Sequence, residues 1–201
     1  VNADKLGTNF FQETDMIGIT IPITKWNHQI TSAREIPAVM AQAFHIARSG
    51  RPGPVVISLT KNAQVEMIEF VYNPAKAIGE LGLRKITPRE QRITDDNIKK
   101  ATELLNCAKK PLIIAGQGIN ISQAWKELEE LAVRGNIPVA TTMLGLGCIN
   151  SHHPLNVGMV GMHGNIAPNS MTQQADVILA VGMRFSDRVT GDIKGYAPRA
   201  W

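Results

Sequence analysis

Apolar positions recur along the chain in two patterns, one with the period of a helix and one typical of buried strands. The first helical stripe is predicted to begin near Pro37, where the missing N–H costs little, and to stop at the Gly-Arg-Pro-Gly-Pro run of 50–54. Its inward positions are Met40, Ala43, Phe44 and Ala47. The β-branched run at 55–59 follows at once. Such a run suits a strand covered on both faces, as in a parallel sheet.

Helices and strands alternate again in the second half of the chain. Thr94 offers an N-cap oxygen to a helix that ends near 108, and a second helix is predicted from Ser122 to Arg134, with Gly135 placed to end it. Their predicted inward positions are Ile98, Ala101, Leu105, Ala108, Trp125, Leu128 and Ala132. Further predicted elements are strands at 111–115, 137–141 and 176–181 and a helix at 167–174. This alternation predicts an open, doubly wound parallel sheet of the α/β class.

Between these halves, residues 66–88 show no sustained period and contain two glycines, an Asn-Pro and a Thr-Pro pair. A stretch of this length is uncommon as a loop inside one compact domain. We therefore expect part of an α/β domain at 1–65, a linker at 66–88 and the doubly wound domain at 89–201.

Composition agrees with a globular protein and narrows the choice of partners. Hydrophobic residues make up 44% and charged residues 19% of the chain. The net charge of +4 is scattered and not interleaved with aromatics, which argues against nucleic acid and is compatible with an anionic small molecule. No apolar run is long enough for a membrane span and no signal peptide is evident, so we expect a cytoplasmic protein, of which this chain is a piece. Cys107 and Cys148 lack a metal or redox spacing and are predicted to be buried thiols.

The residues able to carry chemistry follow the predicted strands, which is where ligands bind in open parallel sheets. Gly116 and Gly118 superficially match a dinucleotide-binding loop, but Ile121 stands where its third glycine is expected. A tight turn that requires positive φ is the alternative. Both interpretations are compatible with backbone N–H groups that approach a phosphate.

Two arginines and one histidine are further candidates. Arg184 and Arg188 are spaced so that both guanidinium groups can reach one face, and a guanidinium matches phosphate or carboxylate oxygens. The alternative is a surface salt bridge with Asp187 or Asp192, and spacing alone does not decide between the two. A catalytic base at His163 would need an orienting carboxylate, so a histidine packed in a loop is the favoured interpretation.

Six motifs carry a family resemblance. They are GTNFFQETD at 7–15, TKWN at 24–27, SGRPGPV at 49–55, TMLGLG at 142–147, GMVGMHG at 158–164 and RFSDRVTG at 184–191. In this order and spacing they resemble the large catalytic subunit of acetolactate synthase (acetohydroxyacid synthase), a thiamine-diphosphate enzyme. The resemblance implies that 1–65 is the end of the pyrimidine-binding domain. It also implies that 89–201 is the central domain, which holds FAD in that family and is expected here without its final strand.

The resemblance also assigns residues to sites. It places Phe11 and Gln12 on the active-site wall near the thiamine cofactor, and Arg51 and Lys61 near the flavin and the substrate channel. The positions that match the lining of the FAD cleft are Gly116, Gly118, Thr142, Met143, Gly161, Met162, His163, Gly182, Arg184 and Arg188. On this basis the two arginines are expected to face the flavin, and His163 becomes a residue of the cleft instead of a base.

The implied reaction removes CO₂ from pyruvate and joins the remaining two-carbon unit to a second 2-keto acid, giving 2-acetolactate or 2-aceto-2-hydroxybutyrate for branched-chain amino-acid synthesis. Thiamine diphosphate, Mg²⁺ and FAD are the implied cofactors, and a homo-oligomer with a small regulatory subunit is the implied assembly. The family's catalytic glutamate and its Gly-Asp-Gly motif are absent from these residues, so this chain alone is expected to be inactive. The alternatives are another thiamine-diphosphate enzyme, such as a glyoxylate carboligase or pyruvate oxidase, and a non-catalytic nucleotide-binding module.

Three residues depart from the family pattern. Ser58, Asn62 and Ser186 stand where aspartates are usual. The loss of a carboxylate at 186, beside the two arginines, is expected to relax contacts with the flavin.

Overall fold

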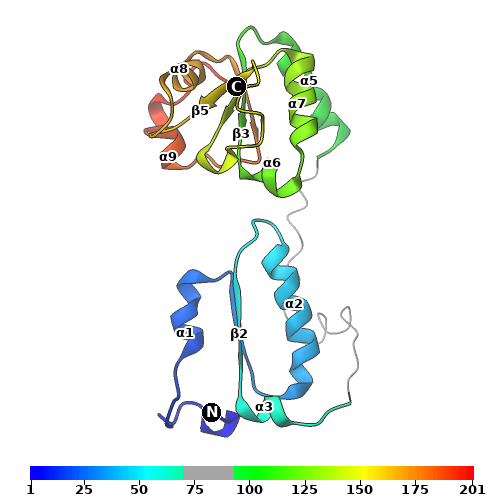
Figure 1. Cartoon of the computed structure of the whole chain (residues 1–201), viewed down its shortest axis with the longest axis vertical. Coiled ribbons are helices and arrows are strands. Elements are labelled where there is room, and N and C mark those ends of the chain that lie inside the picture. Colours follow the sequence, from blue (N-terminus) through cyan, green and yellow to red (C-terminus); the bar gives the residue numbers. More distant parts are fainter. Residues whose placement is uncertain (70–92) are drawn as a thin grey trace. The chain divides into compact units, whose positions relative to one another are not determined.

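A computed structural model describes residues 1–69 and 93–201, which form two compact units (Figure 1). Unit 1 lies within Val1–Arg92 and unit 2 is Ile93–Trp201. Most of the predicted linker, from 70 to 88, lies outside the described residues. Within the described ranges, no helix has the length and apolar character needed to cross a membrane.

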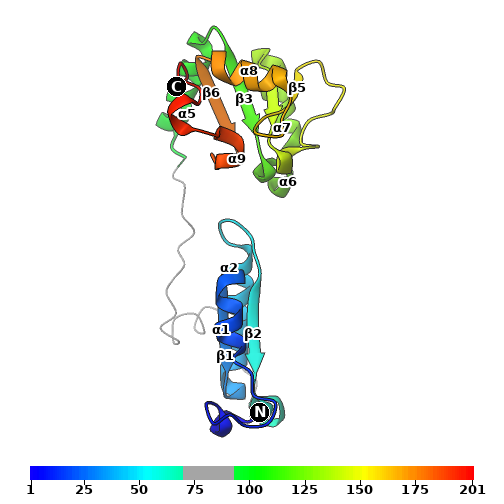
Figure 2. The same ribbon diagram turned by 90° about the vertical axis from the view of Figure 1, so that its left-hand side faces the viewer.

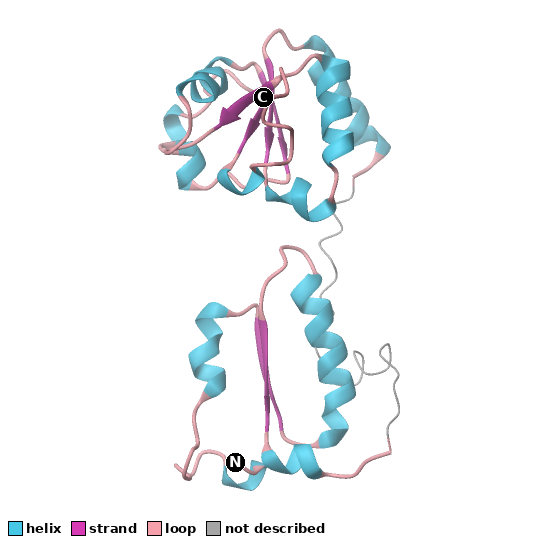
Figure 3. Ribbon diagram, viewed as in Figure 1, coloured by secondary structure: helices cyan, strands magenta, loops and turns pink. Residues whose placement is uncertain are grey.

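Unit 1 is built on two parallel strands, β1 (Trp26–Ile30) and β2 (Val55–Leu59), paired in register along their whole length. Helices α1 (Met16–Thr20) and α2 (Ile36–Arg48) contact both strands from opposite sides, and α3 (Lys61–Val65) follows β2 (Figures 1 and 3). Short 3₁₀ turns occupy Ala3–Lys5, Ile21–Ile23 and Ala33–Glu35. The strand at 55–59 was predicted. The strand β1 was not, because three of its five residues are polar.

The buried face of α2 differs from the predicted stripe. Its buried residues are Ala38, Val39, Gln42, Ala43 and Ile46, whereas Met40 and Phe44 are 38% and 64% exposed. The predicted stripe shares only Ala43 with the observed one and is rotated from it by one residue, or about 100°. Apolar side chains lie on both stripes, and the contact of Val39 with Ile30 and Ala63 in the core selects one of them.

Lys25 holds the C-terminal end of α2. Its ammonium donates to the carbonyl oxygens of Ile46 at 2.5 Å and Ser49 at 2.6 Å, beside the Ser49 N–H that caps the helix through the His45 and Ile46 carbonyls. We expect Lys25→Met to lower the free energy of unfolding by about 1–2 kcal/mol, measured by urea denaturation. Lys99→Met, on the exposed face of another helix, is the control. Equal stability of the two variants would contradict this assignment.

Unit 2 contains a four-stranded, fully parallel sheet in the order β5-β4-β3-β6. Its strands are β3 (Pro111–Ala115), β4 (Val139–Thr141), β5 (Asn156–Met159) and β6 (Val177–Val181). Its helices are α5 (Asp95–Cys107), α6 (Gln117–Ser122), α7 (Trp125–Gly135), α8 (Ile166–Gln174) and α9 (Asp187–Thr190). Short 3₁₀ turns lie at Met143–Gly145 and Ile193–Gly195. The Trp201 carbonyl accepts from the Ile178 N–H of β6, and the Trp201 N–H donates to the carbonyl of Asp176, directly before that strand.

Helices cover both faces of this sheet, which confirms the doubly wound α/β fold (Figure 1). One core joins Ile113 and Val139 of the sheet to Leu128 and Ala132 of α7. The other joins Leu112 and Ile114 to residues of α8 and α9. Alternate residues of these strands thus pack into the two cores on opposite faces of the sheet, as expected for a sheet covered on both sides.

Some predicted details of unit 2 are wrong. In α5 no residue is buried and Ile98 is 53% exposed, although Thr94 does cap the helix by accepting from the Asn97 N–H. Trp125 is half-exposed at the start of α7, and Cys107 is exposed while Cys148 is buried. The segment 116–118 opens a helix instead of remaining a turn. Periodicity shows that a helix has an apolar side but not how much of that side the rest of the fold covers.

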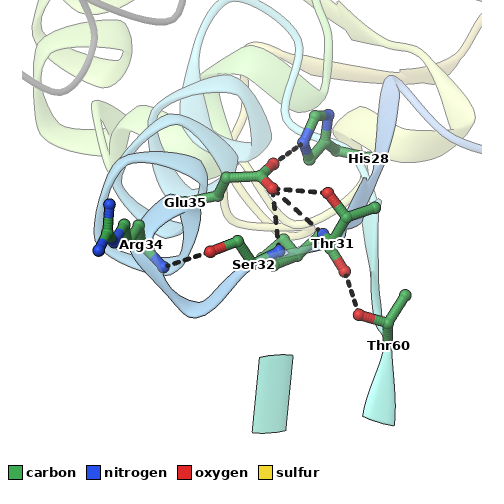
Figure 4. Close-up of polar contacts among 7 residues, drawn as sticks. His28, Thr31, Ser32, Arg34, Glu35 and Thr60 are labelled. Atoms are coloured by element: carbon green, nitrogen blue, oxygen red, sulfur yellow. Dashed lines mark hydrogen bonds and ion pairs between the residues drawn. The ribbon is translucent and has the colours of Figure 1, made fainter. Parts of the chain in front are cut away.

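A network of side-chain hydrogen bonds lies at the carboxyl end of β1 in unit 1. The Glu35 carboxylate accepts from the Thr31 hydroxyl at 2.9 Å and the Ser32 N–H at 3.0 Å, and it lies 3.2 Å from His28 Nε2 (Figure 4). Partial burial would raise the pKa of Glu35, but the hydrogen bonds from Thr31, His28 and Ser32 outweigh burial and hold the pKa below its ordinary value. The ionised form of Glu35 therefore stabilises the folded chain.

The pH dependence of this contribution has a definite sign. The pKa of Glu35 is lower in the folded chain than in the unfolded one. Its contribution to the free energy of unfolding is therefore fully present above the ordinary carboxyl pKa and is lost as the pH falls through the folded pKa. We expect Glu35→Gln to be less stable than the unaltered chain at pH 7, with the difference shrinking towards about pH 3. Urea denaturation across that range measures it. Glu103→Gln, on exposed α5, is the control, and a pH-independent difference for Glu35→Gln would contradict the argument.

Candidate functional site

The carboxyl ends of the four strands of unit 2 meet at one edge of the sheet. Ala115 pairs with Thr141 and Val181, and Thr141 pairs with Met159, so each strand ends at the same level. Figure 2 shows β3 and β6 pointing to the edge where α6 and α9 begin. The structure therefore brings together the predicted cleft residues Gly116, Gly118, Thr142, Met143, Gly161, Met162, His163, Gly182, Arg184 and Arg188.

The strand order creates a switch point at this edge. From β3 the chain moves to β4 and β5 on one side, and then crosses to β6 on the other side of β3. The connections on either side of the β3–β6 pair thus lead away in opposite directions. Open α/β sheets bind ligands in the crevice outside such a point.

Glycines allow the segments after β3 and β6 to touch. A Cβ at Gly116 would lie 2.4 Å from the Gly182 carbonyl oxygen, and one at Gly118 would lie 2.5 Å from the Gly182 Cα. The Gly116 N–H donates to the Val181 carbonyl at 2.9 Å, and the Gly118 N–H donates to the Gly182 carbonyl at 2.8 Å. These two amides are thus engaged within the protein. The sequence interpretation in which they approach a phosphate is replaced by one of close backbone packing.

The loop after β5 is anchored to α8 and α9. Gly161 is buried with φ +104°, and the Met162 N–H donates to the Arg188 carbonyl at 2.9 Å. Asn169 of α8 bonds both peptide groups of Gly161 through its side chain. Sequence reasoning missed Asn169. The available signal was a pair of asparagines four residues apart, directly after a glycine-rich loop.

Charged groups at the edge are open to solvent. Arg184 is exposed and forms no ion pair with any residue of 1–69 or 93–201, whereas Arg188 lies 3.6 Å from its neighbour Asp187. Both partners of that pair are mostly exposed, so it adds little stability. His163 is exposed and has no hydrogen bond or ion pair within the described ranges. Without an orienting carboxylate, His163 lacks the geometry of a general base.

Apolar side chains accompany these cations. Met143, Met162 and Phe185 are each more than half exposed, and they follow β4, β5 and β6 in turn. A groove of about 680 Å³ lies over the ends of β4 and β5 and is lined partly by Thr141, whose buried hydroxyl has no partner among the described residues. The edge thus offers positive charge and exposed apolar side chains, whereas the unpaired Thr141 hydroxyl is buried. These features suit an anionic ligand that also carries an extended ring system.

Comparison with known proteins identifies the family. A family model described as "Thiamine pyrophosphate enzyme, central domain" matches residues 98–200, just over half of the chain. The chain belongs to the thiamine pyrophosphate enzyme family. The match covers nearly all of unit 2, including the sheet edge with its glycines and arginines.

Individual relatives align with both units. A probable acetolactate synthase large subunit of Methanococcus aeolicus is 43% identical over 97% of this chain and 32% of its own length. The mitochondrial acetolactate synthase catalytic subunit of Saccharomyces cerevisiae is 41% identical over 100% of this chain and 29% of its own. The acetolactate synthase isozyme 1 large subunit of Escherichia coli is 38% identical over 100% and 34%, respectively. The chain thus spans about a third of the length of these curated relatives.

The four site residues predicted in unit 1 of this thiamine pyrophosphate enzyme do not form one cluster. Lys61 begins α3, directly after the carboxyl end of β2, whereas Arg51 precedes the amino end of the same strand. Phe11 and Gln12 lie in the loop before α1, with Phe11 82% exposed and Gln12 at φ +66°. Unit 1 therefore presents Arg51 and Lys61 at opposite ends of one strand.

Two of the departures from the family pattern acquire a structural description. The Asn62 side chain donates to the Thr31 carbonyl at 2.7 Å and accepts from the Ala3 N–H at 2.8 Å. An aspartate could accept but not donate, so asparagine is the better bridge here. Ser186 precedes α9 without a side-chain cap, and its carbonyl accepts from the Val189 and Thr190 amides. Nothing in the structure explains Ser58, which lies within β2 opposite Gln29.

Proposed function

We propose that this chain belongs to an acetolactate synthase, which condenses two pyruvates, or pyruvate and 2-ketobutyrate, with release of CO₂. The observation that carries this proposal is the set of relatives named acetolactate synthase that align with 97% or more of the chain at 38–46% identity. They cover unit 1 as well as unit 2. A likeness confined to the central-domain match at 98–200 would support only a thiamine pyrophosphate enzyme in general.

The proposed ligand of the sheet edge in unit 2 is FAD. A dinucleotide flavin combines two phosphates with two ring systems, and the edge offers Arg184 and Arg188 as cations and Met143 and Met162 as exposed apolar contacts. The amides of Gly116 and Gly118 are already bonded, so we assign phosphate recognition to the arginines.

The thiamine site is proposed to include Phe11, Gln12 and Lys61 of unit 1. Thiamine diphosphate, held with Mg²⁺, supplies an electron sink for decarboxylation when it is bound. Phe11 would exclude water from the reacting atoms, Gln12 would offer an amide for orientation, and Lys61 would attract the keto-acid carboxylate. Arg51 is proposed as a further flavin-binding residue. Within the described ranges, no cluster of three or more His, Cys, Asp or Glu side chains could hold the metal.

The remaining parts of the proposal concern assembly and place of action. We propose a homo-oligomer of catalytic subunits, with a small regulatory subunit as a further partner, acting in the cytoplasm. The substrates are small 2-keto acids, and no nucleic acid or membrane partner is proposed. Gel filtration of the complete protein, with and without a co-expressed small subunit, tests the assembly.

An activity assay tests the reaction directly. The complete protein as its source cell makes it is incubated with pyruvate, thiamine diphosphate, Mg²⁺ and FAD, and acetolactate is measured. Formation of acetolactate from pyruvate alone is the expected result. Oxygen consumption without acetolactate would instead indicate an oxidase, and product formed only from glyoxylate would indicate a different carboligase.

A binding experiment tests the flavin assignment separately. The complete protein, stripped of bound cofactor, is titrated with FAD, ADP and CoA, and flavin fluorescence and calorimetry report binding. We expect FAD to bind most tightly. Preference for ADP or CoA, with FAD ignored, would overturn the flavin assignment and favour a nucleotide-binding module.

A further inference from the structure

Two asparagines, Asn165 directly before α8 and Asn169 within it, hold the end of β5 and the residues that follow. The Asn165 side-chain oxygen accepts from the Met159 N–H at 3.1 Å, and the Asn165 backbone N–H donates to the Met159 carbonyl at 2.7 Å. One turn later, the Asn169 side chain accepts from the Gly161 N–H at 2.9 Å and donates to the Gly161 carbonyl at 3.0 Å. Residues four apart lie on the same face of a helix, so the start of α8 forms hydrogen bonds with this segment at two positions, Met159 and Gly161.

The contact made by Asn169 takes the place of a strand partner. The strand β5 ends at Met159, so the peptide groups of Gly161 lie beyond the ladder that pairs β5 with β4. Gly161 is buried, and an unpaired N–H there would be costly. A side-chain amide carries one donor and one acceptor side by side, which is the arrangement a neighbouring peptide would offer. Asn169 therefore fixes the plane of the Gly161 peptide groups as well as its position.

The opposite side of the loop is fixed by α9. A Cβ at Gly161 would lie 2.5 Å from the Arg188 carbonyl oxygen, and that oxygen accepts from the Met162 N–H at 2.9 Å. Gly161 and Met162 are thus held between Asn169 on one helix and Arg188 on another. The side chains of Met162 and His163, which follow directly, are exposed at the edge of the sheet.

We propose that Asn169 is a positioning residue of the cofactor site and acts through Gly161 to hold Met162 and His163 in the shape that binds the flavin. The inference rests on the proposed function, in which the sheet edge binds FAD. It assigns to α8 a role that requires no contact between Asn169 and the ligand. Removal of the amide leaves the Gly161 N–H without a partner and leaves the Gly161 carbonyl bonded to the Gly164 N–H alone, which lets Met162 and His163 move.

The test compares three variants of the complete holoenzyme. Asn169→Ala removes both hydrogen bonds to Gly161, and we expect it to bind FAD about tenfold more weakly. Ser170→Ala is the matched control on the same helix, since among the described residues the Ser170 hydroxyl bonds the Gln174 side chain alone, at 3.0 Å. It is expected to bind FAD as the unaltered protein does. The visible circular dichroism of the bound flavin, recorded at saturating FAD, should change for Asn169→Ala and not for Ser170→Ala.

Asn169→Asp separates positioning from a general loss of stability. An ionised aspartate can accept from the Gly161 N–H but cannot donate to the Gly161 carbonyl, whereas a protonated one can do both. We therefore expect the FAD affinity of Asn169→Asp, relative to the unaltered protein at the same pH, to rise as the pH falls towards the usual pKa of a carboxyl group. The same ratio for Asn169→Ala should not change with pH.

Failure of the flavin site and failure of the role of Asn169 give different results. If the unaltered protein fails to bind FAD, the proposed flavin site fails, and this inference fails with it. If the unaltered protein binds FAD and Asn169→Ala binds it equally well, only the role of Asn169 is refuted. A variant that loses FAD only in proportion to its unfolding in urea, together with a flat pH profile for Asn169→Asp, would show that Asn169 serves the fold alone.

Discussion

Replacement of Gly182 by alanine is expected to lower the free energy of unfolding of unit 2 by about 3 kcal/mol. Gly182 has φ +61°, which costs an L-residue free energy, and a Cβ there would lie 2.7 Å from the Gly118 Cα and 2.8 Å from the Ile119 nitrogen. Both contacts are with backbone atoms, so no side chain can rotate away. Relief requires β6 to separate from the start of α6, which would break the Gly118–Gly182 hydrogen bond.

Urea denaturation of the variant measures this effect, and Gly147→Ala is the matched control. Gly147 also has positive φ, at +86°, but no heavy atom lies within 4 Å of the position of its Cβ. The control therefore carries only the conformational penalty, about 1 kcal/mol. If both variants lose the same stability, close packing of the β3 and β6 segments is not what requires glycine at 182.

Arg184→Ala is expected to reduce the affinity for FAD by about 10–100-fold, the range for loss of a charge-assisted hydrogen bond. Arg184 is exposed at the switch point and has no ion-pair partner among residues 1–69 and 93–201. Its removal therefore leaves no protein group unpaired, and the folded chain should keep its stability. The loss should appear in binding alone.

Fluorescence titration with FAD measures this effect on the complete protein. Arg184→Lys retains the charge without the planar fork and is expected to recover part of the affinity. Arg199→Ala, which removes another exposed arginine of unit 2, is the control and should bind as the unaltered protein does. Unchanged affinity in Arg184→Ala would remove Arg184 from the proposed site, whatever becomes of Arg188.

The strands of unit 2 illustrate how far sequence reasoning reaches. Apolar runs at 111–115 and 176–181 predict strands, and the structure confirms strands at Pro111–Ala115 and Val177–Val181. The strand β5 escaped notice because Asn156-Val157-Gly158-Met159 carries only two large apolar residues and a glycine at φ +98°. Its backbone is bonded by two side chains, that of Asn156 within the strand and that of Asn165 beyond its end.

The site shows a similar division. Glycines and arginines after successive strands suffice to predict a ligand-binding edge, because parallel strands end on one side of a sheet. The partners of each group cannot be predicted in this way. The Gly116 and Gly118 amides bond the carbonyls of Val181 and Gly182, far along the chain, and the Asn169 side chain bonds Gly161.

By itself, the amino-acid sequence determined the α/β class, the order of most strands and helices, and the motifs that relate the chain to thiamine pyrophosphate enzymes. These are local properties of periodicity, capping and residue type. Only the tertiary structure decided which face of α2 is buried, which glycine amides are already paired, and that Arg184 remains without an ion-pair partner within the described residues while Arg188 lies beside Asp187. Each of these depends on which surfaces approach one another, because burial and hydrogen bonding are settled by neighbours distant in the chain.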